Sequence, residues 1–211
     1  MGDLVLWGAS GHGKVVLDVA RAMGKFKTIS FIDDACDESA HEFCDCQVFG
    51  ASRYLQLLKD KGCSQYVVSI GRNEMRAACF QRAFDHGLLP ARLIHPSAVI
   101  SESARVDAGT VVMAKAVINA GAQIGKNCIV NTAAVVEHDC VIGDHVHLSP
   151  GVLLGGGVTV GKSAHVGMGA VVLPGAHIGE SAVVGAGSVV LKSVPPGVTV
   201  AGVPSRPLHS K

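Results

Sequence analysis

An aliphatic residue returns at every sixth position over almost half of the chain. In the frame that runs from Ile94 to Val190, every position is Ile, Val or Leu. Two residues before these positions, from Ala98 to Ser188, the chain has a small or β-branched residue. Residues two apart point to the same face of a strand. Each six-residue unit is therefore predicted to be a short strand with one aliphatic and one small residue turned inward.

Glycine often follows the aliphatic position, as at Gly125, Gly143 and Gly155, where it tolerates a sharp corner. Three strands and three corners close an 18-residue triangular coil, so residues 93–211 are predicted to form a parallel β-helix of about five coils. A β-sandwich is disfavoured because no hairpin turns interrupt the period. The spacing alone does not determine the hand of the coil.

Residues 1–92 have a different pattern, in which short apolar strands alternate with helical segments. This alternation predicts a small Rossmann-like βαβαβα domain. The expected strands are 4–7, 28–32 and 66–70, and the expected helices run from the glycine-rich turn to about residue 23, near 52–61 and from 73 to about 86.

Composition narrows the class of protein further. Hydrophobic residues make up 48% of the chain and charged residues 17%, which provides a core and excludes a disordered chain. A net charge of +1 gives no field that would attract nucleic acid or an anionic membrane. The seven cysteines form no Cys-x-x-Cys pair, and no apolar run is long enough to span a membrane. We expect a soluble cytoplasmic protein with reduced thiols and no metal site.

Two segments of the N-terminal domain are candidates for nucleotide binding. The turn Gly8–Gly13 offers backbone N–H groups and a helix N-terminus to an anion, although its glycine spacing is not G-x-G-x-x-G. Asp33 and Asp34 follow the second strand, where a carboxylate can bind a ribose or a base edge. A tight turn beside two solvated aspartates is the alternative.

His138 is the candidate catalytic residue of the repeat. It lies two residues after the inward Val136, hence at a corner, between Glu137 and Asp139. A neighbouring carboxylate orients an imidazole and stabilises its protonated form, as a general base requires. His147 and His165 point outward from one face, one coil apart. Zinc is disfavoured because outward residues on separate coils do not converge.

Several motifs together resemble a known family of sugar O- and N-acyltransferases, the sialic acid O-acetyltransferase and UDP-N-acetylbacillosamine N-acetyltransferase type. The motifs span the whole chain: the hexapeptide ladder, the segment from Gly8 to Val16, Asp33-Asp34, Ile94-His95-Pro96, Glu137-His138-Asp139-Cys140 and the tail Ala201-Gly202-Val203-Pro204-Ser205-Arg206. The resemblance implies that the β-helix is left-handed. It also implies a homotrimer with acetyl-CoA between adjacent β-helices and a nucleotide-linked amino sugar held by the N-terminal domain.

The resemblance also implies roles for individual residues. His138 is the implied general base, and Asp139, where the family often has Glu, raises its basicity. The implied acetyl-CoA contacts are His147, Gly156 (through its N–H, as an oxyanion donor), Met168 and Ala186. Those to the sugar nucleotide are Ser10, Gly11, His12, Asp33, Asp34 and Gly71. In the 18-residue frame, Gly156 lies one coil after His138, and Ala186 one coil after Met168.

The leading functional interpretation is transfer of acetyl from acetyl-CoA to the amine of a UDP-linked 4-amino-4,6-dideoxy sugar. GDP-perosamine N-acetylation and sialic acid O-acetylation are close alternatives, because the same base, groove and nucleotide cleft serve all three. A non-catalytic nucleotide-binding scaffold is a different class, disfavoured by the intact His138-Asp139 pair. An NAD-dependent oxidoreductase is disfavoured by the glycine spacing.

Overall fold

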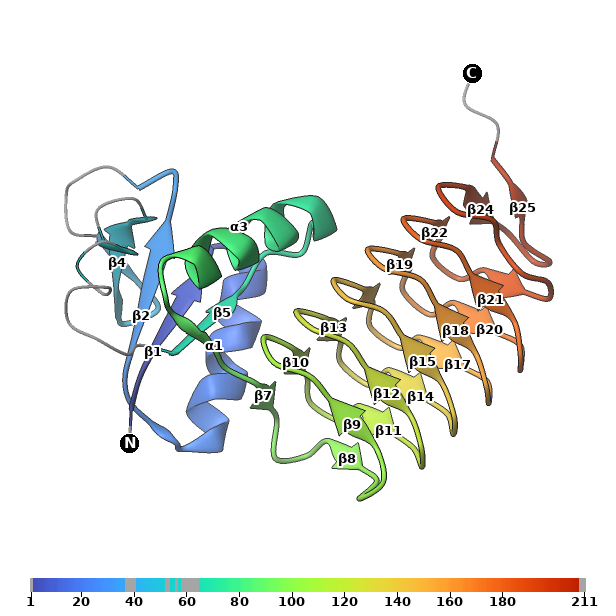
Figure 1. Cartoon of the computed structure of the whole chain (residues 1–211), viewed down its shortest axis with the longest axis horizontal. Coiled ribbons are helices and arrows are strands. Elements are labelled where there is room, and N and C mark those ends of the chain that lie inside the picture. The colour runs from blue at the N-terminus through green and yellow to red at the C-terminus, as the bar shows by residue number, and fades with distance from the viewer. Residues whose placement is uncertain (1, 37–40, 52–53, 56, 58–64, 209–211) are drawn as a thin grey trace. The chain divides into compact units, whose positions relative to one another are not determined.

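The structure, a computed structural model, describes residues 2–36, 41–51, 54–55, 57 and 65–208 (Figure 1). It divides into two compact units, Met1–Pro96 and Ser97–Lys211. The sequence places the boundary near residues 92–96, with the domains taken as 1–92 and 93–211. The first unit is α/β and the second is a parallel β-helix, as the periodicity predicts. Within the described ranges, no helix is long and apolar enough to cross a bilayer.

The first unit is built on one sheet with strand order β3-β4-β2-β1-β5-β6. Its central strands β2, β1 and β5 are parallel, and their apolar runs form a core with Trp7, Tyr66 and Phe80. The bounds are β1 (Gly2–Trp7), α1 (Gly11–Met23), β2 (Phe26–Asp33), β3 (His41–Phe43), β4 (Cys46–Gly50), β5 (Gln65–Val68), α3 (Asn73–Asp85), β6 (Leu89–Pro90) and β7 (Leu93–Ile94).

The hairpin β3–β4 is absent from the sequence-based prediction. Its two strands pair antiparallel through a tight turn in which Cys44 and Asp45 have φ of 52° and 59°. Positive φ at both central residues is the geometry of a type I′ turn, which is common in two-residue hairpins, and Asp tolerates it. Most of the helix expected near 52–61 lies outside the described residues.

The second unit winds three sheets around a narrow core, and Figure 1 shows the strands stacked coil upon coil. Each strand pairs with the strand 18 residues later, as in Val117↔Val135 and Val135↔Leu153. The predicted 18-residue coil is thus confirmed.

The first face contains β10 (Val111–Val112), β13 (Ile129–Val130), β16 (His147–Leu148), β19 (His165–Val166), β22 (Val183–Val184), β24 (Thr199–Ala201) and β25 (Arg206–Pro207). Among the described residues, all strand pairs within these coils are parallel except the terminal pair of β24 and β25, which is antiparallel. The second contains β8 (Val99–Ile100), β11 (Val117–Ile118), β14 (Val135–Val136), β17 (Leu153–Leu154), β20 (Val171–Val172) and β23 (Val189–Val190). The third contains β9 (Arg105–Val106), β12 (Gln123–Ile124), β15 (Val141–Ile142), β18 (Thr159–Val160) and β21 (His177–Ile178).

The two inward positions of each unit fill the core of the β-helix as expected. Aliphatic residues such as Val136, Leu154 and Val172 are buried, and so are small residues such as Ala134 and Cys140. Corners alternate with the strands, and many have a residue with positive φ. These corners carry side chains out of the core, which is where the candidate chemistry lies.

Candidate active site

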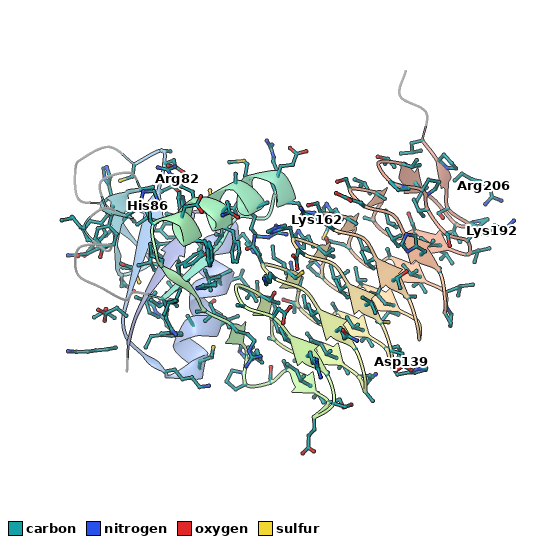
Figure 2. All side chains as sticks on the ribbon, in the orientation of Figure 1. Arg82, His86, Asp139, Lys162, Lys192 and Arg206 are labelled. Atoms are coloured by element: carbon teal, nitrogen blue, oxygen red, sulfur yellow. The ribbon has the colours of Figure 1, made fainter. Side chains whose placement is uncertain are left out.

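His138 and Asp139 occupy the corner between β14 and β15. Asp139 adopts the left-handed conformation, with φ of 59°, and its N–H donates to the Ala120 carbonyl of the preceding coil at 3.0 Å. Asp tolerates this conformation better than most residues. The turn directs both side chains outward, and Figure 2 shows Asp139 at the outer edge of the β-helix.

The two side chains form a histidine–carboxylate pair. His138 Nδ1 lies 2.9 Å from Asp139 Oδ2, and the side chains are 63% and 74% exposed. The hydrogen bond to Asp139 raises the pKa of His138 above its usual value, and the charge of Glu137 adds to this. With Nδ1–H donated to the carboxylate, Nε2 is the nitrogen that can accept a proton.

Glycines in the two neighbouring coils make room for this pair. A Cβ on Gly156 would lie 2.5 Å from His138 Nε2, so the ring rests directly against the Gly156 backbone. A Cβ on Gly121 would lie 2.6 Å from Asp139 Oδ1. The family resemblance implies Gly156, and its 18-residue spacing from His138 supports it; Gly121, one coil before Asp139, was missed although the same spacing points to it.

His147 lies on β16, on the first face of the β-helix. It points outward as predicted, but it is only 9% exposed and is not a solvated surface residue. Its ring stacks on that of His165 with 4.8 Å between centroids, and Asn131 Nδ2 donates to His147 Nε2 at 3.2 Å. His165 Nε2 in turn lies 2.8 Å from Ser149 Oγ. Asn131 is a polar neighbour that the sequence analysis missed.

Met168 and Ala186 lie at a different corner from His138. They fall between the first and second faces, where the Gly187 N–H donates to the Met168 carbonyl at 2.8 Å. Met168 is exposed, as a residue that lines a groove would be. The structure therefore stacks Met168 with Ala186 and His138 with Gly156, but within one chain it does not bring the two pairs together.

In the first unit, the predicted residues gather at the carboxyl ends of the parallel strands. Ser10 is the N-cap residue of α1, and Gly11 is its first residue. The Ala9 N–H donates to Asp33 Oδ2 at 2.8 Å, and Ser69 Oγ donates to the Gly8 carbonyl at 2.9 Å. The loops that follow β1, β2 and β5 are thus tied to one another at the edge of the sheet where such folds bind nucleotides.

Asp34 is engaged by two neighbours and is not simply solvated. Trp7 Nε1 donates to Asp34 Oδ2 at 3.1 Å, and Arg82 donates to Oδ1 at 2.8 Å. The Arg82 guanidinium also lies 5.0 Å from the Trp7 ring centroid. The sequence analysis missed Trp7 and Arg82 as partners of Asp34, since Arg82 is 48 residues away in the chain.

Arg76 is a second residue of this edge that the sequence analysis missed. It is buried on α3, and its guanidinium donates to the carbonyls of Ile70 and Gly71 at 3.2 and 3.1 Å. Burial, and then the charge of Arg76, lower the pKa of His12 to about 4. His12 is therefore neutral at physiological pH and can offer one donor and one acceptor nitrogen. Among the described residues, no group of three or more His, Cys, Asp or Glu side chains is placed so that it could hold a metal ion.

Comparison with known proteins agrees with this arrangement. Residues 3–83 match the PglD N-terminal domain family, and residues 121–156 and 157–192 match the bacterial transferase hexapeptide family. The fold and the histidine corner thus define a hexapeptide-repeat transferase with an N-terminal α/β domain.

Proteins of known structure narrow the class to a family. A mutant of perosamine N-acetyltransferase from Caulobacter crescentus, in complex with CoA and GDP-perosamine, is 40% identical with a TM-score of 0.94, over 100% of this chain and 98% of that one. The acetyltransferase domain of PglB from Neisseria gonorrhoeae FA1090, in complex with acetyl coenzyme A, is 39% identical with a TM-score of 0.90, over 98% of each chain. The chain belongs to the sugar N-acetyltransferase family that includes these two proteins, which confirms the predicted family.

A curated relative from Bacillus subtilis (strain 168), UDP-N-acetylbacillosamine N-acetyltransferase, is 40% identical over 119 residues. The match covers 54% of this chain and 52% of the relative, so it spans about half the length of that protein.

Proposed function

We propose that the protein transfers the acetyl group of acetyl-CoA to the amine of a nucleotide-linked amino sugar. The observation that carries this proposal is the histidine–carboxylate pair at 2.9 Å, fitted against Gly156 in a chain that belongs to the sugar N-acetyltransferase family. The relatives named above bind or are named for GDP-perosamine and a UDP-linked sugar, so both nucleotides are acceptor candidates.

His138 is the proposed general base. An amine that attacks a thioester must lose a proton, and His138 Nε2, which lies beside the Gly156 backbone, is the proposed acceptor while Asp139 holds Nδ1. The hydrogen bond that raises the His138 pKa makes the ring a stronger base once it is neutral. The Gly156 N–H, one coil away, is the proposed hydrogen-bond donor to the thioester oxygen.

The first unit is the proposed site for the sugar nucleotide. Ser10, Gly11 and His12 offer the N-terminus of α1 to phosphate, while Asp34 and Gly71 border the same edge of the sheet. Both oxygens of Asp33 accept backbone N–H groups, from Ala9 and Ala35, so Asp33 acts by shaping the turn.

A homotrimer is the proposed working form, with His147, Met168 and Ala186 as acetyl-CoA contacts. In one chain the Met168 corner and the His138 corner lie on opposite sides of the second face. A neighbouring copy that brings its Met168 corner to His138 would give a groove lined by both. The outward residues of that face, partly or well exposed, form an apolar ladder suited to contact between copies: Val99, Val117, Val135, Leu153, Val171 and Val189.

The proposal is tested by free-thiol release from acetyl-CoA with UDP-4-amino-4,6-dideoxy-N-acetylglucosamine, GDP-perosamine and sialic acid as acceptors. We expect turnover with an amino sugar nucleotide. Release with sialic acid alone would replace N-acetylation by O-acetylation, and release with none would overturn the proposal. Light scattering that gives a monomer mass at micromolar protein would remove the shared groove. We place the reaction in the cytoplasm, where thiols such as those of this chain stay reduced.

A further inference from the structure

The peptide between Gly155 and Gly156 is fixed from inside the β-helix by a thiol. Cys140 is fully buried, and its Sγ donates to the Gly155 carbonyl at 3.2 Å. The same carbonyl accepts a longer bond from the Val158 N–H at 3.4 Å. Burial raises the pKa of the Cys140 thiol, which keeps its proton in place for donation.

This contact and the Val158 N–H keep the Gly155 carbonyl turned inward, which sets where the Gly156 N–H points. The carbonyl and the N–H of a trans peptide point in opposite directions. Because the Gly155 carbonyl faces the buried thiol, the Gly156 N–H points away from the core. Among the described residues, this N–H donates to no neighbouring carbonyl.

The rest of the corner is held by two other hydrogen bonds. The Gly156 carbonyl accepts from the Gly175 N–H, and the Gly157 N–H donates to the His138 carbonyl, both at 2.9 Å. The backbone on both sides of the outward N–H is therefore fixed, and the Gly156 Cα lies against the His138 ring. The remaining peptide, Gly155–Gly156, is held by the Val158 N–H at 3.4 Å and by the shorter contact of the Cys140 thiol at 3.2 Å.

We propose that Cys140 is a positioning residue, whose thiol aligns the Gly155–Gly156 peptide so that the Gly156 N–H meets the oxyanion that forms on the acetyl group. This inference rests on the proposed acetyl transfer. A hydrogen bond to the carbonyl of a peptide also polarises that peptide and strengthens donation by its N–H. Cys140 itself touches no substrate, and no bond to sulfur forms or breaks.

The chain offers a matched control at another corner. Cys128 is buried to 1% exposure, and its Sγ donates to the Gly143 carbonyl at 3.1 Å and to the Lys126 carbonyl at 3.5 Å. Both cysteines therefore bond to a glycine carbonyl 15 residues later. Gly143, however, lies at a corner without His138. If removal of the thiol acts only on the structure, both variants should be affected alike. If it acts on the position of the Gly156 N–H, kcat should change only in the Cys140 variant.

The test compares Cys140→Ala, Cys140→Ser and Cys128→Ala in the full-length protein, by kcat, both KM values and thermal melting. For Cys140→Ala we expect a fall in kcat of about 2- to 10-fold, the change that loss of one neutral hydrogen bond gives. Both KM values should stay within about twofold of wild type, since a contact made in the transition state alone affects kcat. Cys140→Ser retains a donor and should recover most of kcat, and Cys128→Ala should melt like Cys140→Ala with wild-type kcat.

Two results would overturn the inference. One is equal kcat for Cys140→Ala and Cys128→Ala, which would make the thiol a structural contact only. The other is a loss in Cys140→Ala that appears in KM or that serine does not restore. Failure of the wild-type protein to turn over any amino sugar nucleotide is a separate outcome and would refute the proposed function instead.

Discussion

Replacement of Gly156 by alanine tests whether the fit between two coils governs catalysis. The added Cβ would lie 2.5, 2.6 and 3.2 Å from three atoms of the His138 ring. Ordinary contact begins near 3.4 Å, so the ring must move by about 1 Å, a displacement that can cost about 10²-fold in rate. We therefore expect kcat to fall about 100-fold in Gly156→Ala.

The same substitution should have little effect on the fold. Gly156 does not have a positive φ, so alanine fits its backbone conformation. The atoms that the Cβ meets belong to a side chain that is 63% exposed and can swing outward. We expect the free energy of unfolding to change by less than about 1 kcal/mol, measured by denaturant unfolding.

A double-mutant cycle with His138→Ala separates this mechanism from others. His138→Ala should lower kcat by about 10²–10⁴-fold, the usual contribution of general base catalysis. If Gly156→Ala acts through the ring, adding it to His138→Ala should cost less than about twofold more. Near wild-type kcat for Gly156→Ala, or a further 100-fold loss in the double variant, would refute the reasoning.

Three further predictions concern the neighbours of the site. The hydrogen bond to Asp139 raises the His138 pKa, and the neutral ring is the proposed base, so kcat/KM should rise with pH through that pKa. In Asp139→Asn the midpoint of this pH profile should move to lower pH, and an unchanged midpoint would exclude Asp139 as the cause of the raised pKa. Gly121→Ala should displace Asp139 and lower kcat, because the added Cβ would lie 2.6 Å from Asp139 Oδ1. Gly197→Ala, with φ of 69° against 72° and nothing within 4 Å of its Cβ, carries the same backbone strain and should leave kcat unchanged. Equal kcat for the two variants would contradict the contact. Asp34→Ala should raise KM for the nucleotide sugar but not for acetyl-CoA, with Asp18→Ala on the exposed side of α1 as control. The Asp34–Arg82 pair is 50% and 38% exposed, so its loss should cost at most about 1 kcal/mol of stability. An equal rise in both KM values would count against Asp34 as a contact of the nucleotide sugar.

The repeat made most of the second unit predictable. A fixed period of six determines which residues face inward, and three units per coil determine which residues lie above one another. The same spacing supports Gly156, which the family resemblance implies, as a neighbour of His138 one coil away, and in the structure the two are in contact. The orientation of His147 was predicted in the same way, but its burial was not, because burial depends on the size of the rings stacked on that face.

The first unit was less predictable because its contacts are not periodic. The partners of Asp34 come from β1 and α3, and no local pattern connects Trp7 or Arg82 with it. The hairpin β3–β4 turns at Cys44 and Asp45, which both have positive φ. Neither is a glycine, so the sequence does not mark the turn. The main helices and strands of the first unit could be predicted from the sequence, whereas the side-chain contacts across the edge of its sheet could not.

The His138–Asp139 pair shows how a repeat gains a proposed catalytic site without a change in its backbone. The residues at successive coils of one corner are Ala120, His138, Gly156 and Pro174, and their neighbours are Gly121, Asp139, Gly157 and Gly175. Of the second set, Asp139 is the member with a side chain, yet its φ of 59° is close to the 72°, 67° and 71° of the three glycines. The backbone at this position of the corner is therefore left-handed in all four coils. The site arises because two side chains are introduced in one coil, while glycine at 121 and 156 leaves the space that they occupy.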